Sequence, residues 1–202
     1  MYIRTLVACC LLYIYLFPGN DGGLYAAIQL PSIIGDHMVL QQQAFPALWG
    51  RARPGEQIVV VPGWDQNAPT VAYADSKGRW RIPVATPAAG GPYEILIQGN
   101  ENRILLRDVW IGEVWILGGG RPFLQKNREA PEPSSQFAFS PEIRFFSVGI
   151  DHASTLRSDV GGSWNTLNNQ ARLDSLSALG VQMALTLHDS LEVPVGIIEA
   201  TQ

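Results

Sequence analysis

Short stretches in which apolar and polar residues alternate dominate residues 28–107. Such alternation is typical of β-strands with one buried face. Gly, Pro, Asp and Ser cluster between the stretches, as tight turns require. Many short strands separated by regularly spaced turns favour a β-sandwich. The strands predicted here are Val39–Gln41, Ala47–Trp49, Ile58–Val61, Trp80–Val84, Tyr93–Ile97 and Ile104–Leu106.

The pattern changes after residue 107. Residues 108–117 form a nearly continuous apolar run, which is typical of a strand buried on both faces. Leucines recur at spacings of three and four over residues 173–191 and predict one helix that ends at Glu192–Pro194. Strand, helix and strand in this order begin an α/β domain. The two further buried strands that we predict are Phe145–Val148 and Val195–Ile198.

The first 27 residues have the organisation of a secretory signal peptide. Arg4 supplies the positive start, Leu6–Phe17 is an unbroken apolar run, and Pro18–Gly23 interrupts it. The run is shorter than the ~20 residues of a transmembrane helix. We therefore predict a signal peptide at 1–27, a β-sandwich domain at 28–107 and an α/β domain at 108–202. The mature protein is expected to be secreted or periplasmic, without a stable membrane anchor.

Both cysteines, Cys9 and Cys10, lie in that apolar run. Leu6–Cys9 imitates a lipoprotein cleavage box, but the apolar core lies mostly after Cys9, so ordinary membership of the core is favoured. Cleavage would leave a mature chain with no disulfide and no thiolate metal site.

Composition excludes several classes of protein. Hydrophobic residues make up 47% and charged residues 16% of the 202 residues, and the net charge is −4. These values exclude a disordered chain and argue against a nucleic-acid-binding protein. Three histidines without paired spacing do not predict a metal site. The run Gly118–Gly120, followed by Arg121 and Pro122, fits neither a dinucleotide fingerprint nor a phosphate loop, so no cofactor is expected and a flexible loop is favoured.

The β region carries several large aromatic residues that have two possible roles. Exposed aromatic rings stack on sugars, but large aromatic side chains more often form the core, and we favour the core. His37 lies in a Gly-Asp-His turn and is predicted to be a solvated turn residue. The aromatic residues concerned are Trp49, Trp64, Tyr73, Trp80 and Tyr93.

Several segments, in order along the chain, resemble the sialate O-acetylesterase family. The resemblance implies a β-sandwich followed by the amino-terminal part of an SGNH-type hydrolase domain, which is incomplete here. It also implies an ancestral activity that removes O-acetyl groups from sialic acids or other carbohydrates by serine acyl transfer. The segments are Leu30–Ile33, Met38–Gln42, Leu48–Gly50, Gly91–Tyr93, Asp108–Trp115 and Val193–Ile198.

The nucleophile motif of the family has changed in this chain. The family's Ser-Gly-Gln-Ser-Asn-Met follows its Gly-Glu-Val-Trp segment; counted from Gly112–Trp115, Gly119 matches the glycine and Arg121 occupies the position of the attacking serine. A guanidinium has no hydroxyl and cannot form an acyl-enzyme. The family's oxyanion-hole glycines and its Asp and His block would follow beyond Gln202. We therefore expect a truncated, catalytically inactive member.

Other serines of the chain are poor substitutes for the missing nucleophile. Ser134, Ser135 and Ser163 have the hydroxyl, and His152 and His188 are possible bases, but none lies in a strand–turn–helix nucleophile elbow. Two functions stay open. One is a carbohydrate esterase that acts by serine acyl transfer. The other, which we favour, is a truncated or degenerate, inactive member that binds carbohydrate, acetylated or not, through the β-sandwich or the open end of the α/β half. Unpaired strand edges in the incomplete α/β half also predict self-association.

Overall fold

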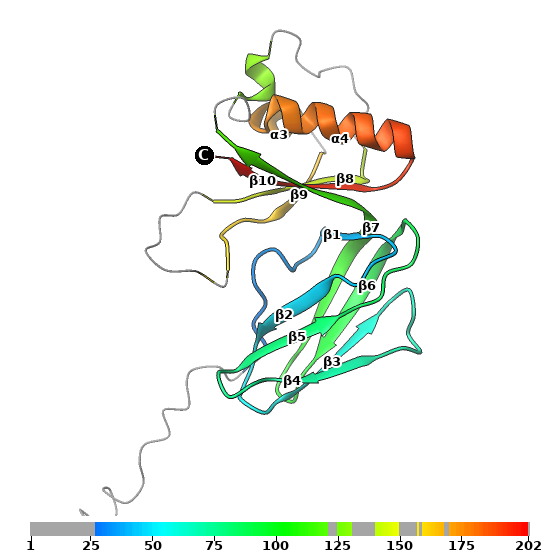
Figure 1. Cartoon of the computed structure of the whole chain (residues 1–202), viewed down its shortest axis with the longest axis vertical. Helices are drawn as coiled ribbons and strands as arrows, with labels where there is room; N and C mark the ends of the chain where they lie inside the picture. The colour runs from blue at the N-terminus through cyan, green and yellow to red at the C-terminus, as the bar shows by residue number, and fades with distance from the viewer. Residues whose placement is uncertain are drawn as a thin grey trace, which may run out of the picture.

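A computed structural model describes residues 27–120, 125–130, 140–149, 157, 159–167 and 170–201 (Figure 1). The predicted signal segment therefore lies almost wholly outside the described residues. The elements are β1 (Val39–Gln41), β2 (Ala47–Arg51), β3 (Gln57–Pro62), β4 (Thr70–Tyr73), β5 (Arg79–Pro83), β6 (Gly90–Gln98), β7 (Arg103–Gly119), a 3-10 turn η1 (Asn127–Glu129), β8 (Ile143–Ser147), β9 (Trp164–Thr166), α3 (Gln170–Ser175), α4 (Ala178–Leu191) and β10 (Val195–Thr201).

All six strands predicted in residues 28–107 are present, and β4 is added to them. β2 and β5 form a two-stranded antiparallel sheet that lies over a larger sheet with the order β4-β3-β6-β7 (Figure 1). Along β5, exposed and buried residues alternate strictly, so every second side chain enters the core. The two sheets share one apolar core, which includes Leu48, Trp80 and Ile82 from the small sheet and Ile58, Val60, Ile95 and Ile97 from the large one.

Strand β7 connects the two halves of the molecule. Its 17 residues pair first with β6 antiparallel, then with β1 parallel at Trp110–Gly112, and finally with β10 parallel at Glu113–Gly119. The sequence pattern predicts two separate strands here, Ile104–Leu106 and a second one within residues 108–117. The predicted division between residues 107 and 108 falls inside β7, at Asp108, whose backbone has a φ of 54°. One strand thus belongs to both hydrophobic cores.

The second half is a mainly parallel sheet with the order β7-β10-β8-β9, in which only β9 is antiparallel to its neighbour. Helices α3 and α4 cover one face of this sheet (Figure 1). The single helix predicted for residues 173–191 is two helices. α3 ends at Ser175, and Ser177 caps α4 by accepting a hydrogen bond from the Gly180 N–H at 3.3 Å. The predicted end is confirmed: Glu192 closes α4 in a left-handed conformation.

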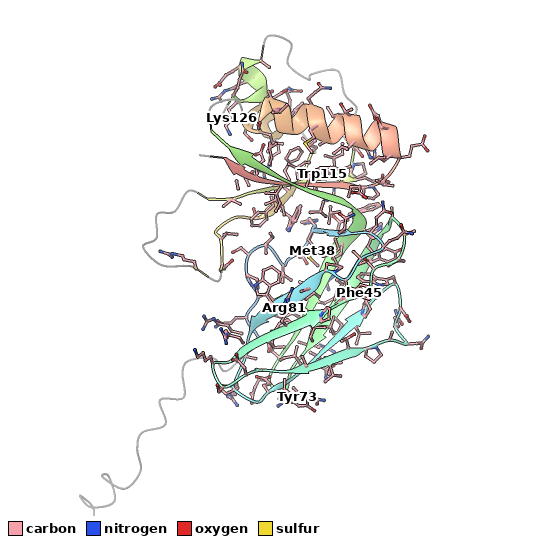
Figure 2. The ribbon with its side chains drawn as sticks, in the orientation of Figure 1. Met38, Phe45, Tyr73, Arg81, Trp115 and Lys126 are labelled. Carbon is pink, nitrogen blue, oxygen red and sulfur yellow. The ribbon has the colours of Figure 1, made fainter. Side chains whose placement is uncertain are left out.

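The other face of this sheet is covered in part, which the sequence did not predict. Val39 lies so close to Gly196 that a Cβ on the glycine would come within 2.8 Å of the Cβ of Val39. Trp164 packs on Phe146 with ring centroids 5.6 Å apart, and its indole N–H donates to the carbonyl of Ile33 at 2.7 Å. The segment that precedes β1 thus closes over the sheet. In Figure 2, Met38 lies at this junction.

One edge of this sheet is open in the part of the chain that the structure describes. Residues 113–119 of β7 pair with β10 on one side, and no described strand pairs with them on the other. Trp115 (Figure 2) and Ile116 in this stretch are 43% and 72% exposed. Among the described residues this stretch of β7 is thus an unpaired edge, and the incompleteness of the α/β half stays a prediction.

The aromatic side chains of the first half divide between core and surface. Trp80 is buried, and Trp64 packs edge-on against Tyr93 with centroids 5.5 Å apart. Trp49 and Tyr73 are 36% and 65% exposed, so the favoured core interpretation is wrong for these two. Trp49 projects outward because Leu48 and Gly50, its neighbours along β2, face the core.

Candidate functional site

The carboxyl end of β7 is where sequence analysis placed the altered nucleophile motif. Gly118 and Gly119 lie opposite Ala200 and Thr201 of β10, and both glycines are exposed. Ligand sites of parallel sheets form at this end of the strands. Gly119 is therefore at the expected end of the sheet, whereas Arg121 lies outside the described residues.

Glu199 is the buried acid nearest this end. It is 4% exposed, and its Oε1 accepts a hydrogen bond from the backbone N–H of Ser177 at 2.9 Å. Burial raises the pKa of this carboxyl, while the hydrogen bonds from Ser177 and Ser147 and the charge of Lys126 oppose the rise. The side chain thus links the start of α4 to β10 by a hydrogen bond, which is a structural role.

Neither described histidine lies near Gly119. His37 contacts Asp108, eleven residues earlier on β7, and His188 lies at the end of α4, next to the start of β10. The six residue steps from the start of β10 to the position opposite Gly119 correspond to about 20 Å of strand. A base must lie within hydrogen-bond reach of the group that it deprotonates. The structure therefore does not bring His188 to the altered motif.

His188 does have a serine partner, which sequence analysis missed. Its Nε2 lies 3.3 Å from the Oγ of Ser140, and its Nδ1 lies 2.9 Å from the carbonyl oxygen of Val193. Ser140 also accepts a hydrogen bond from the N–H of Glu142 at 3.2 Å, which is the geometry of a serine that closes a turn. The pair lies at the amino end of β8 and stabilises the turn there.

The other proposed replacements are not brought together with a base. Ser163 is exposed and contacts Asn165, whose side-chain amide donates to the carbonyl of Ser163 at 2.8 Å. Ser163 precedes β9, beside the end of β8, whereas His188 lies at the opposite end of the sheet. The remaining candidates, Ser134, Ser135 and His152, lie outside the described residues.

His37 is not merely a solvated turn residue, as the sequence had suggested. Its Nδ1 lies 2.6 Å from Oδ2 of Asp108, and the same oxygen accepts from Nη2 of Arg144 at 2.9 Å. Oδ1 of Asp108 accepts from the indole N–H of Trp110 at 2.9 Å. Arg144 is only 2% exposed, and its guanidinium carbon lies 6.0 Å from the ring centroid of Trp110, within cation–π range.

These contacts determine the ionisation of the cluster. Partial burial by itself would raise the pKa of Asp108, but the hydrogen bonds from His37 and Trp110 and the charge of Arg144 lower it overall. Burial lowers the pKa of Arg144, and Asp108 opposes that change. The carboxylate therefore holds a buried cation of β8 against β7 and the turn before β1. We name His37, Asp108 and Arg144 the junction cluster.

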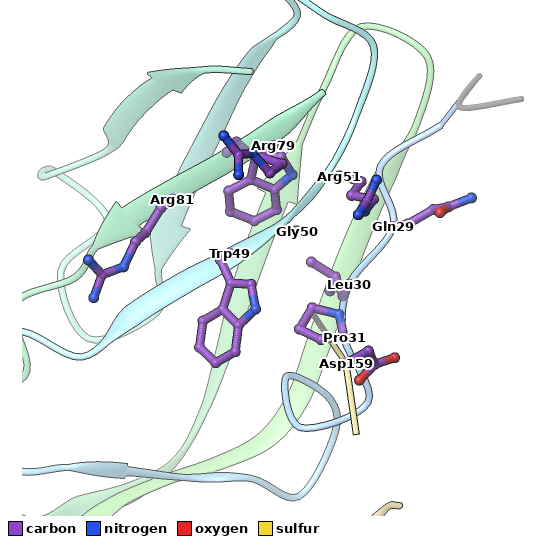
Figure 3. A pocket seen from close by; sticks show the side chains of 10 residues that line it. Gln29, Leu30, Pro31, Trp49, Gly50, Arg51, Arg79, Arg81 and Asp159 are labelled. Atoms are coloured by element: carbon purple, nitrogen blue, oxygen red, sulfur yellow. The ribbon is translucent and has the colours of Figure 1, made fainter. Parts of the chain in front are cut away.

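A cavity of about 650 Å³ lies on the outer face of β2 and β5 (Figure 3). A smaller cavity of about 240 Å³, with almost wholly apolar walls, lies between β1, β2 and the β7–β10 sheet. Only the larger one combines an exposed aromatic ring with charged groups; its lining includes Trp49, Arg51, Arg79, Arg81 and Asp159.

The described residues hold no group of three or more His, Cys, Asp or Glu side chains that could bind a metal ion. Within the same residues, no helix has the length and apolar character needed to cross a membrane.

A scan against models of protein families finds no match, and a comparison with curated protein sequences finds none either. Among solved structures, the chain is similar to a carbohydrate acetylesterase from Xanthomonas citri, with 28% sequence identity and a TM-score of 0.80. The likeness covers 87% of this chain and 40% of that enzyme. Together with the mostly β architecture, it relates this chain to a carbohydrate esterase, of which the chain spans about two fifths of the length.

Proposed function

We propose that this chain is a relative of the carbohydrate O-acetylesterases that binds carbohydrate without hydrolysing it. The observation that carries the proposal is the likeness to the Xanthomonas citri enzyme over most of this chain, which supports carbohydrate as the ligand class. The sialate O-acetylesterase family, with its β-sandwich and SGNH-type hydrolase domain, is the relationship that the sequence motifs favour. Sialic acid is one carbohydrate among those this relationship allows.

Two features support the absence of catalysis. Arg121 stands where the family's motif has its serine, and a guanidinium provides no nucleophilic hydroxyl. In addition, both described histidines lie far from Gly119, and acyl transfer requires nucleophile, base and oxyanion donors acting together.

A fluorophosphonate probe tests this part of the proposal, because it labels activated serines. We expect no adduct in the intact mass of the purified chain, and none after the Arg121→Ser substitution, since a serine without a base is barely nucleophilic. A stoichiometric adduct on the unmodified chain that Ser140→Ala or His188→Gln removes would overturn the proposal.

We further propose that the chain is exported to the cell exterior or the periplasm, on the basis of Arg4 and the apolar run Leu6–Phe17. The open edge of β7 supports self-association as well. Trp115 and Ile116 are exposed beside backbone groups that no described strand pairs with, and such edges favour pairing with another chain. The natural partner of this edge is another strand.

A further inference from the structure

The larger cavity has the dimensions of a small-molecule site, since such sites usually measure ~300–1,000 Å³. It is built on residues far apart in the sequence: Leu30 and Pro31 precede β1, Trp49 belongs to β2, Arg81 to β5, and Asp159 precedes β9. In Figure 3, Trp49 lies between Arg81 on one side and Leu30, Pro31 and Asp159 on the other.

Strand register explains why an aromatic ring and several cations share this surface. In the β2–β5 ladder, Trp49 lies directly opposite Arg81, and Arg51 lies directly opposite Arg79. Directly opposed residues and residues two apart on one strand project from the same face of a sheet. All four side chains therefore project outward, whereas Leu48 and Ile82 enter the core.

Trp49 offers a flat apolar surface. Its side chain is 36% exposed, although the residue lies in a strand with a well-packed inner face. The C–H bonds on one side of a pyranose ring form an apolar patch that matches an exposed indole. Leu30 and Pro31 add further apolar wall without hydrogen-bond donors in their side chains. The cavity therefore suits a ligand with an apolar ring face.

The charged groups of the cavity differ in their partners. Arg79 forms an ion pair with Asp75 at 2.7 Å, whereas the guanidinium of Arg81 has no ion-pair or hydrogen-bond partner among the described residues. Asp159 is held by the N–H and the hydroxyl of Ser32, at 2.8 and 3.3 Å. The cavity thus presents an unengaged guanidinium, which pairs best with a carboxylate, and an oriented carboxylate, which accepts hydrogen bonds from hydroxyl groups.

We propose that this cavity binds an acidic carbohydrate chain: a pyranose ring stacks on Trp49, its carboxylate pairs with Arg81, and its hydroxyls donate to Asp159. The inference deepens the proposed carbohydrate binding and rests on it. The net charge of −4 on the chain opposes unspecific attraction of a polyanion, so binding would require local contacts.

Affinity electrophoresis of the full chain in gels with polygalacturonate or neutral galactan tests the proposal. We expect polygalacturonate to retard the chain at concentrations at least tenfold lower than galactan. Trp49→Ala should weaken the interaction with polygalacturonate about tenfold or more. Arg81→Gln should weaken it several-fold and leave retardation by galactan unchanged. Both side chains project outward, so circular dichroism should remain that of the parent chain.

Matched controls separate the site from general effects of surface and charge. Tyr73→Ala removes another exposed aromatic ring, and Arg103→Gln makes the same change of charge as Arg81→Gln; neither residue lines the cavity. Relative to its own mobility in a gel without polysaccharide, each control variant should be retarded as much as the parent chain. If Tyr73→Ala weakens binding as much as Trp49→Ala, the assignment of the cavity is wrong.

The remaining outcomes distinguish this inference from the proposed function. Equal retardation by both polysaccharides, with no effect of Arg81→Gln, would overturn the acidic ligand and leave carbohydrate binding intact. If neither Trp49→Ala nor Arg81→Gln changes the retardation, the carbohydrate binds at another surface and the assignment of the cavity is wrong. Absence of retardation by either polysaccharide would overturn both this inference and carbohydrate binding by the chain.

Discussion

Asp108→Asn should destabilise the protein because Asp108 is the anion of the junction cluster. Removing one partner of a buried ion pair costs about 3–5 kcal/mol. Arg144 is 2% exposed, but Asp108 is 31% exposed, and water compensates part of the loss there. We therefore expect a loss of about 2–3 kcal/mol in the free energy of unfolding. Asn tolerates a positive φ, so at this position, where φ is 54°, the substitution removes the charge without straining the backbone.

Urea unfolding at pH 7, followed by tryptophan fluorescence, measures this loss. The matched control is Glu101→Gln, which removes the exposed partner of Arg53 and should cost less than about 1 kcal/mol. In a thermal melt, the loss expected for Asp108→Asn corresponds to about 4–12 °C. If Asp108→Asn and Glu101→Gln shift the midpoint equally, the junction cluster contributes nothing beyond a surface ion pair and the reasoning is refuted.

The pH dependence of the same pair has a definite sign. The pKa of Asp108 is lowered in the folded chain. The contribution of Asp108 to the free energy of unfolding is therefore complete above the ordinary carboxyl pKa of about 4 and is lost as the pH falls through the lowered pKa. The difference in stability between the parent chain and Asp108→Asn should therefore shrink between about pH 5 and pH 2. A difference that stays constant over this range would contradict the assignment of charge.

Three further predictions concern other parts of the chain. Burial raises the pKa of Glu199, so stability should fall as the pH rises through that value; Glu199→Gln should flatten this dependence in urea midpoints measured at pH 5 and pH 8, and an unchanged slope would contradict it. Ile116→Lys should reduce self-association in sedimentation velocity, whereas Phe45→Lys, a change at a similarly exposed residue outside β7, should not; equal effects would remove the open edge as the cause. Amino-terminal sequencing of exported protein should start between about Gly23 and Ile28, and a chain that still starts at Met1 would refute the signal peptide.

The strands of the first half were predictable because one face of each is buried. In β5, Trp80 and Ile82 alternate with arginines, and this local pattern is sufficient to identify a strand. The continuity of β7 was not predictable, since the polar residues Arg107 and Asp108 interrupt the apolar pattern, and the pairing with β6 resumes after a register shift at these residues. The break between α3 and α4 was hidden because Leu173 and Leu176 keep helical spacing up to the capping serine.

The candidate site was predictable only where neighbours in the sequence determine it. Leu48 and Trp49 are adjacent in one strand and must face opposite sides, so burial of Leu48 implies an outward Trp49. The position of Arg81 beside Trp49 depends on the register between two strands, which no local pattern specifies. The contact of His37 with Asp108 likewise joins residues 71 positions apart, so only the folded chain brings it about.

A proton NMR time course of the purified chain with acetylated glucuronoxylan measures carbohydrate binding and ester hydrolysis together. One sample reports both binding, through broadening of the sugar resonances, and hydrolysis, through the methyl signal of free acetate. We predict broadened sugar resonances and a free-acetate signal that grows no faster than in a sample without protein. Growth of free acetate in proportion to protein concentration, or sugar resonances that stay sharp at every protein concentration, would contradict the account of a chain that binds carbohydrate without hydrolysing it.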